Sequence, residues 1–130
     1  MKPLNKYFPK SKKIPIDKFI ENALYDKNYG YYSKKIPFGR KGDFITSPEI
    51  SFLFSEMLAL WVISLWENLN KPKIFNIVEL GPGSGKMNLT LIRVFKKFPH
   101  FFSSINIFLY EKSEKLKKLQ KKTLWSEKIK

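Results

Sequence analysis

Cysteine is absent from this 130-residue chain, and histidine occurs once, at His100. The lack of cysteine excludes disulfide bridges, thiolate chemistry and zinc sites with cysteine ligands. A single histidine is too few for a histidine-rich metal site. We therefore expect no metal centre in this chain.

Long apolar runs are also missing. The longest, Met57 to Trp66, is interrupted by Ser64 and is too short to span a bilayer. The N-terminal stretch, MKPLNKYFPKSKKIPID, has basic residues but no apolar core of a secretory signal. It also lacks the arginine and the amphipathic pattern of a mitochondrial transit peptide. These absences predict a cytoplasmic protein without a membrane span.

Acidic residues and arginine are scarce. The chain has 25 Lys+Arg against 11 Asp+Glu, a net charge of +14, and its only arginines are Arg40 and Arg93. Such basicity can indicate a nucleic-acid or an anionic membrane partner. Interfaces that bind bases or phosphates bidentately favour arginine, however, and abundant lysine, isoleucine, asparagine and phenylalanine are typical of AT-rich coding. Nucleic-acid binding by the lysine-rich tail is thus an alternative and not the leading hypothesis.

What is present is enough apolar surface for a folded domain, at 43% hydrophobic and 16% aromatic residues. We divide the chain into a flexible basic lead (1–15), a helical and loop segment (16–70) and a third segment (71–130). Apolar spacing predicts a helix over 16–25, and residues 31–46 resemble an ordered loop. A second helix is expected to be capped by Ser47 and to continue to about residue 69. Because it is apolar nearly all round, we expect it to be buried.

The third segment alternates strands and helices. IFNIVEL (74–80) predicts a buried strand, and a glycine-rich loop and a helix over 87–98, ended by Pro99, follow it. INIFLYE (105–111) predicts a second strand, and the tail from Lys112 predicts a helix with Leu116, Leu119 and Leu124 on one side. This order predicts a βαβ unit of an open parallel sheet, and hence an α/β fold.

The glycine-rich loop, VELGPGSGKM at 78–87, carries the strongest functional signal. A P-loop requires G-x-x-x-x-G-K-[ST], but Leu80 and Met87 occupy two of its required positions. A dinucleotide fingerprint requires G-x-G-x-x-G, and Lys86 stands at its third glycine. The pattern that fits is an acidic residue followed by alternate glycines: Glu79, Gly81, Gly83 and Gly85.

A carboxylate follows the next strand as well. Glu111 is expected at the same carboxyl edge of the sheet, where it can accept hydrogen bonds from ribose hydroxyls. The helix after the glycine loop offers free N–H groups to a carboxylate. A ligand with an amino acid and a ribose but no phosphate matches S-adenosylmethionine. The simpler alternative is that the glycines only form a tight turn.

Five further motifs carry a family resemblance: GYY (30–32), FGRKGDFITSPEIS (38–51), SEMLALW (55–61), ELGPGSG (79–85) and YEKSEKLKKLQ (110–120). With them the chain resembles, over about residues 16–125, the MidA-like class I S-adenosylmethionine-dependent methyltransferases, relatives of a mitochondrial complex I assembly factor. The resemblance implies the N-terminal part of a Rossmann-like methyltransferase fold, with a helical extension before it and an incomplete sheet. It also implies methyl transfer to a protein arginine, with a respiratory complex subunit as partner.

The resemblance also assigns roles to residues. It implies that Glu79 and the loop from Gly81 through Pro82, Gly83 and Gly85 hold the methionine end of the cofactor, and that Glu111 holds the ribose. The segment around Thr46 and Ser47 would close over the cofactor or the acceptor. Asp43 and Glu49 are the candidate catalytic carboxylates, which would orient a guanidinium group.

Two observations limit the resemblance. Ser84, Lys86 and Thr90 differ from the residues expected for the family, and the chain ends after its second predicted strand. We therefore expect a fragment that lacks later strands. A non-catalytic binding or assembly module that holds a partner through the apolar helix 48–69 remains the main alternative to an enzyme.

Overall fold

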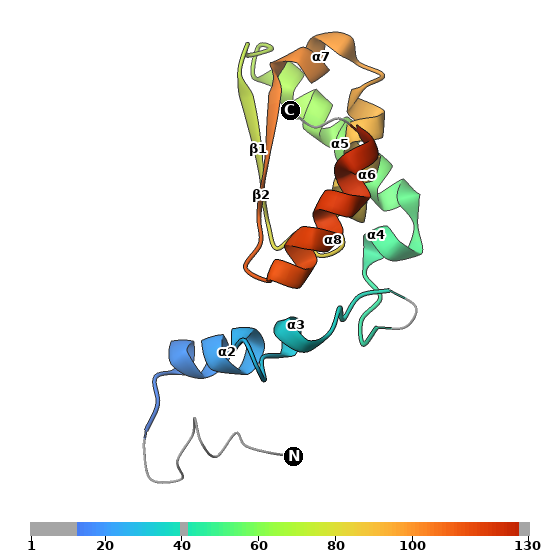
Figure 1. Ribbon diagram of the computed structural model, residues 1–130. Helices are drawn as coiled ribbons and strands as arrows, with labels where there is room; N and C mark the ends of the chain where they lie inside the picture. The colour runs from blue at the N-terminus through green and yellow to red at the C-terminus, as the bar shows by residue number, and fades with distance from the viewer. Residues whose placement is uncertain (1–12, 40–41, 128–130) are drawn as a thin grey trace. The chain divides into compact units, whose positions relative to one another are not determined.

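The structure is a computed structural model that describes residues 13–39 and 42–127, apart from the side chains of Pro48, Glu49 and Ser126. The contacts divide the chain into two units, Met1–Ile36 and Pro37–Lys130 (Figure 1). Most of the predicted basic lead, residues 1–12, lies outside the described residues. The predicted boundary near residue 70 stays a prediction.

In the described part of the first unit, residues 13–36, the helices are α2 (Ile16–Tyr25) and α3 (Tyr31–Lys34). The bounds of α2 are those predicted from apolar spacing. The turn after α2 is closed by Asp26, whose Oδ1 accepts hydrogen bonds from the backbone N–H groups of Asn28 and Tyr29, both at 2.8 Å. The segment predicted as an ordered loop therefore begins with the short helix α3. No residue of either helix is buried.

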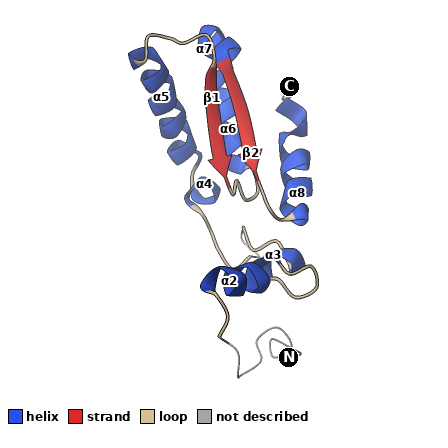
Figure 2. Ribbon diagram, turned by 90° about the vertical axis from the view of Figure 1, so that its left-hand side faces the viewer, coloured by secondary structure: helices blue, strands red, loops and turns tan. Residues whose placement is uncertain are grey.

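The second unit contains the predicted βαβ order. Its elements are α4 (Ser47–Ile50), α5 (Phe52–Asn68), β1 (Phe75–Leu80), α6 (Lys86–Phe95), α7 (Pro99–Ser104), β2 (Ile105–Tyr110), α8 (Glu114–Leu124) and the 3₁₀ turn η1 (Trp125–Glu127). The strands pair in parallel, from Phe75 opposite Ile105 to Leu80 opposite Tyr110. Figure 2 shows α6 behind the two strands, with α5 and α8 on either side. The predicted α/β fold with a parallel strand pair is confirmed.

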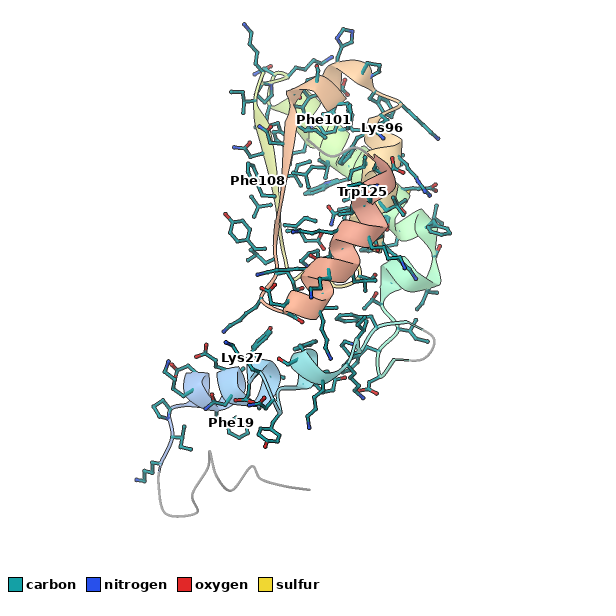
Figure 3. The ribbon with its side chains drawn as sticks, viewed as in Figure 1. Phe19, Lys27, Lys96, Phe101, Phe108 and Trp125 are labelled. Atoms are coloured by element: carbon teal, nitrogen blue, oxygen red, sulfur yellow. The ribbon has the colours of Figure 1, made fainter. Side chains whose placement is uncertain are left out.

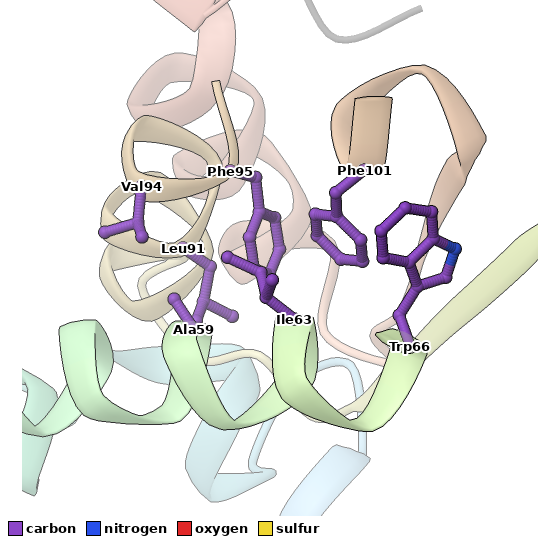
Figure 4. Packing of buried hydrophobic residues seen from close by; sticks show 7 residues of the cluster. All are labelled: Ala59, Ile63, Trp66, Leu91, Val94, Phe95 and Phe101. Atoms are coloured by element: carbon purple, nitrogen blue, oxygen red, sulfur yellow. The ribbon is translucent and has the colours of Figure 1, made fainter. Parts of the chain in front are cut away.

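One face of the sheet carries the core. Alternate residues of the strands (Phe75, Ile77, Ile105, Ile107) pack against a buried cluster made of Ala59, Ile63, Trp66, Leu91, Val94, Phe95 and Phe101 (Figure 4). The Phe101 ring lies edge-on to the rings of Phe95 and Trp66, with centroids 4.9 and 5.3 Å apart. The indole N–H of Trp66 donates to the carbonyl of Pro72 at 2.9 Å, so the one polar atom of this large side chain is satisfied.

The opposite face of the sheet is apolar but exposed. Val78, Leu80, Phe108 and Tyr110 are between 45% and 78% exposed. The remaining pair on this face is polar, because the amide of Asn106 donates to the amide oxygen of Asn76 at 3.0 Å. Within residues 13–39 and 42–127 the sheet has these two strands, which agrees with the expected incomplete sheet. No helix in that part of the chain is long and apolar enough to cross a bilayer.

The prediction of one continuous, buried helix from Ser47 to about residue 69 is wrong, both in its continuity and in its burial. The backbone is extended at Ser51 (φ −145°), which separates α4 from α5, and the Ser51 hydroxyl caps α5 by accepting from the Leu53 N–H at 3.2 Å. Ser47 is thus the first residue of α4 and not a cap. Moreover, α5 buries Ser55, Ala59, Ile63 and Trp66, whereas Phe52, Leu53, Met57 and Trp61 are at least 60% exposed. Apolar composition permits burial, but only a packed neighbour produces it, and α6 covers one side of α5.

The predicted end of the next helix also shifts. α6 ends at Phe95, and Pro99, predicted to end it, is the first residue of α7. Proline suits that position because the first helical N–H has no acceptor within the helix. In α8, Leu116 and Leu124 are buried as expected and Leu119 is partly buried. The helix is capped by Ser113, whose hydroxyl accepts from the Leu116 N–H at 3.4 Å.

Candidate cofactor site

The glycine loop joins β1 to α6 at the carboxyl edge of the sheet. Gly81, Gly83 and Gly85 have φ values of +70°, +57° and +79°, which residues with a Cβ rarely adopt. The loop is tied to the sheet because the Gly81 N–H donates to the Tyr110 carbonyl of β2 at 2.8 Å. A turn within the loop is closed by a 2.9 Å hydrogen bond from the Gly85 N–H to the Pro82 carbonyl. The backbone therefore requires the alternate glycines, whatever the loop binds.

A small cavity lies against this loop. Its volume is about 160 Å³, and its lining consists of Phe38, Thr46, Glu79, Gly81, Pro82, Gly83, Ser84, Lys86 and Met87. Two of these residues come from the segment before α4. The Phe38 ring lies so close to Gly83 that a Cβ there would be 3.5 Å from Phe38 Cε2. Because sites that enclose a drug-sized ligand measure roughly 300–1,000 Å³, this cavity has room for one end of such a ligand.

Glu79 is the acidic residue of the cavity. Its side chain is half-buried on the core side of β1, and its Oε2 accepts a hydrogen bond from the side-chain amide of Asn88. Burial raises the pKa of Glu79 above its usual value, and the hydrogen bond from Asn88 opposes that rise. Asn88 is only 1% exposed. Sequence reasoning missed it, although a polar residue on the first turn of a largely buried helix is a recognisable signal.

Glu111 lies just beyond β2, at the same edge as the loop. Its Oε1 accepts from the Ser113 N–H at 2.8 Å, and its Oε2 accepts from the side-chain amide of Gln120 at 3.2 Å. A carboxylate has about four lone-pair sites, so both oxygens of Glu111 retain the capacity to accept another hydrogen bond. These contacts also fix the orientation of the carboxylate.

Gln120, on α8, connects the two halves of the site. The same amide nitrogen that donates to Glu111 also donates to the carbonyl of Gly83 at 2.9 Å. Its side chain fills the space next to Gly85, where an added Cβ would be 3.5 Å from Gln120 Cγ. At 5% exposure, this is a buried polar bridge between loop and carboxylate. Gln120 is the last residue of the motif YEKSEKLKKLQ (110–120), which carries part of the family resemblance. No pattern in a single sequence predicts its contacts with Gly83 and Glu111.

The segment preceding α5 is only partly drawn into this site. Phe38 and Phe44 form an isolated bridge, in which the Gly39 N–H donates to the Phe44 carbonyl at 3.1 Å. Thr46 lines the cavity, whereas Asp43 and Ser47 are exposed and are not among its lining residues. The backbone of Glu49 lies in α4, and its side chain is outside what the structure describes. The structure thus brings Thr46, but not Asp43 or Ser47, to the loop.

The donor set fits an organic ligand with an amine and hydroxyls better than a metal ion. Across the described ranges, no cluster of three histidine or acidic side chains could hold a metal. A half-buried carboxylate, a loop of glycines at positive φ and an oriented second carboxylate are present instead.

Residues 57–130, more than half of the chain, match the family model described as "Putative S-adenosyl-L-methionine-dependent methyltransferase". The chain belongs to this methyltransferase family. The predicted family and, at the level of the family, the predicted cofactor S-adenosylmethionine are thereby confirmed. Position by position, the roles of the site residues stay predictions.

Two curated relatives and one solved structure are similar to the chain. The protein arginine methyltransferases NDUFAF7 of Mus musculus and Homo sapiens are each 40% identical to it over 118 residues, covering 89% of this chain and 27% of each relative. A protein from Burkholderia thailandensis, described as a "likely methyl transferase" and crystallised with S-adenosyl-homocysteine, has a TM-score of 0.68 and 28% identity. That match covers 88% of this chain and 30% of the other. The chain thus spans little more than a quarter of the length of these relatives.

The comparisons also correct one prediction. The mouse, frog and human relatives are all described as mitochondrial, which contradicts the cytoplasmic location expected for this chain. That expectation was derived from the composition of the N-terminal stretch. The missing arginine and amphipathic pattern of a transit peptide were therefore an insufficient basis for predicting the location.

Proposed function

We propose that this chain supplies the S-adenosylmethionine-binding part of a methyltransferase that modifies a protein arginine. The observation that carries the proposal is the Gln120 bridge, which holds the glycine loop and the Glu111 carboxylate together at one edge of the sheet. Family membership and the names of the relatives support the reaction class. Because the chain spans about 27% of those relatives, the activity of a whole protein of this family is part of the proposal.

Each part of the site has a role in this proposal. The Glu79 carboxylate pairs with the ammonium group of the methionine end, and that positive charge favours the ionised form that burial disfavours. The glycine loop lets the backbone approach this end closely. Glu111 accepts hydrogen bonds from the ribose hydroxyls through its remaining lone pairs. Phe38 and Thr46 close the cavity from the opposite side.

When bound, the cofactor supplies an electrophilic methyl group on a sulfonium centre. The residues of this chain then contribute alignment and charge, which is the main enzymatic contribution to a direct displacement. Asp43 and Glu49 are proposed to orient the guanidinium group of the acceptor, since a carboxylate can hold it through two parallel hydrogen bonds. The acceptor is a protein, and a subunit of a respiratory complex is our specific proposal.

Isothermal titration of the chain with S-adenosylmethionine and with S-adenosyl-homocysteine tests cofactor binding. We expect binding of both, and a loss of about tenfold or more in affinity for Glu111→Gln, because each hydrogen bond to a charged group contributes about 1.5–3 kcal/mol. Glu114→Gln is the matched control, since Glu114 is exposed on α8 and pairs with Lys117. No heat from a folded sample, or equal losses for the two variants, would contradict the proposal.

A second candidate function, a non-catalytic assembly module, is favoured by the exposed side of α5. Phe52, Leu53, Met57 and Trp61 form an apolar surface that is not covered within the described part of the chain. A module that uses this surface would retain its partner after Gly83→Val, which blocks the loop. Loss of the partner with that variant would favour the cofactor-dependent function instead.

A further inference from the structure

The outer face of α8 combines lysines with an exposed tryptophan. The inner face of this helix contains its buried residues, Leu116, Gln120 and Leu124. Residues three or four apart share a helix face, so Lys118, Lys122 and Trp125 form one row and Lys121 lies beside it. All four are exposed, and Trp125 is 85% exposed (Figure 3). This lysine–tryptophan face is on the side of α8 opposite to Gln120, away from the cofactor site.

The turn that contains Trp125 is anchored by ion pairs. Trp125 begins η1, whose last residue, Glu127, pairs with Arg93 of α6 at 3.2 Å and with Lys96, the residue after α6, at 2.7 Å. The ammonium group of Lys96 also donates to the Glu127 carbonyl at 3.1 Å. The turn is therefore tied to the surface of α6 and its C-terminal end, and the exposed indole stands at the beginning of this anchored turn.

The positive charge of this face is only partly offset nearby. Glu114, at the other end of α8 from Trp125, pairs with Lys117 at 2.7 Å and also interacts electrostatically with Lys118 and Lys121. These lysines outnumber the one carboxylate, so the face keeps a net positive charge. The whole chain carries a net charge of +14. Lysines near an anionic membrane surface each contribute to attraction, and tryptophan is enriched at the level of the lipid headgroups, where one edge is apolar and the other is wet.

We propose that the lysine–tryptophan face of α8 binds the surface of an anionic phospholipid membrane, with Trp125 inserted among the headgroups. The helix lies on the membrane and does not span it. Nucleic acid fits this face less well, because none of its cations is arginine and one aromatic ring cannot stack successive bases. This surface is independent of the cofactor site, so the proposal goes beyond the proposed methyltransferase function.

Co-sedimentation of the full chain with lipid vesicles tests the proposal. We expect binding to vesicles that contain phosphatidylglycerol, little binding to phosphatidylcholine alone, and weakening by salt. The variant Lys118→Gln/Lys121→Gln/Lys122→Gln should lose about 100-fold in affinity, since each lysine contributes about a factor of five. Lys27→Gln/Lys34→Gln/Lys35→Gln, with the same change of charge in the first unit, should lose much less.

The tryptophan has a matched control of its own. Trp125→Ala should weaken vesicle binding by roughly tenfold, because binding scales with the apolar area inserted, while Trp61→Ala, which is also exposed but lies on α5, should not. The triple arginine variant at 118, 121 and 122 should bind like the original chain, and thermal melts should show that all variants fold. Equal losses from the two glutamine triples, equal binding to uncharged vesicles, or tighter binding to a labelled oligonucleotide would overturn the proposal.

Discussion

The two ends of the short sheet are built on opposite principles. At the amino end, where the strands begin, the aromatic rings of Trp66, Phe95 and Phe101 close the core, and the nearby polar atom of Trp66 is satisfied. At the carboxyl end, positive-φ glycines, a half-buried carboxylate and a bridging glutamine take their place. Figure 1 shows the strands running from α7 at the first end to the start of α8 at the second.

This contrast between the two ends of the sheet suggests that, within one βαβ unit, the amino end contributes mainly to stability and the carboxyl end mainly to function. Close packing of apolar rings favours folding wherever it occurs. Glycines lose more backbone entropy on folding than other residues, and burial of an ionised carboxylate is unfavourable, so neither feature of the carboxyl end favours folding. Carboxylates with a perturbed pKa cluster at functional sites. Substitutions at the amino end should therefore affect stability first, and those at the carboxyl end should affect ligand binding out of proportion to stability.

The largest effect on stability is expected for Phe101→Ala. This side chain is 1% exposed and contacts three other aromatic rings, so its removal should lower the free energy of unfolding by about 3–5 kcal/mol. Phe108→Ala, on the exposed face of β2, should cost less than about 1 kcal/mol. Urea unfolding of both variants measures the difference. Similar losses would show that the outer face is covered in solution.

Gln120→Leu should have an intermediate effect. It removes the donor to Gly83 and Glu111, and a buried acceptor left without a partner costs about 1–3 kcal/mol. Because the bridge orients Glu111, cofactor affinity measured by calorimetry should fall as well. Lys118→Leu makes a similar change on the exposed side of the same helix and should alter neither quantity appreciably. Unchanged affinity in Gln120→Leu would contradict the role assigned to the bridge.

Gly81→Ala should cost about 1–2 kcal/mol from backbone strain alone. The glycine has a φ of +70°, but no atom lies within 4 Å of an added Cβ, so no clash contributes. Gly81→Asn should cost less, because asparagine adopts positive φ more readily. Thermal unfolding of the pair isolates the strain. If alanine cost as much as a buried clash, several kcal/mol, the loop would be more crowded than the structure shows.

Glu79→Gln should have the smallest effect on stability and a large effect on binding. The folded-state pKa of Glu79 is raised above its ordinary value of 4.5, so the folded chain binds this proton more tightly than the unfolded chain. The group's contribution to stability therefore decreases as pH rises from 4.5 through the raised pKa, and it is unfavourable above that range.

Melting temperatures of the original chain and Glu79→Gln across this pH range provide the measurement. At neutral pH the variant should be as stable as the original or more so, while its affinity for S-adenosylmethionine falls. The stability gap should narrow as the pH is lowered. A variant that is less stable at neutral pH yet binds the cofactor normally would assign Glu79 a structural role instead.

Much of the site was predictable because its determinants are local in sequence. The spacing of Glu79, Gly81, Gly83 and Gly85 predicted a tight loop after a strand, and the positive φ values agree with it. The bounds of α2 followed from apolar spacing, and the parallel pairing of β1 with β2 followed from the strand–helix–strand order. By contrast, Phe38 and Gln120 reach the site from segments distant in the chain, so spacing in one sequence could not reveal them.

The amino-acid sequence by itself determined the strand–helix–strand order of the second unit and the glycine spacing of the loop, because tight turns and strands depend on neighbours in the chain. Only the tertiary structure decided which side of α5 is buried, where a serine interrupts the predicted helix, and how Gln120 joins the loop to Glu111. The physical reason is that burial and long-range hydrogen bonds depend on which surfaces meet. The same residue can be buried or exposed, and bonded or not, depending on which other segment of the chain packs against it.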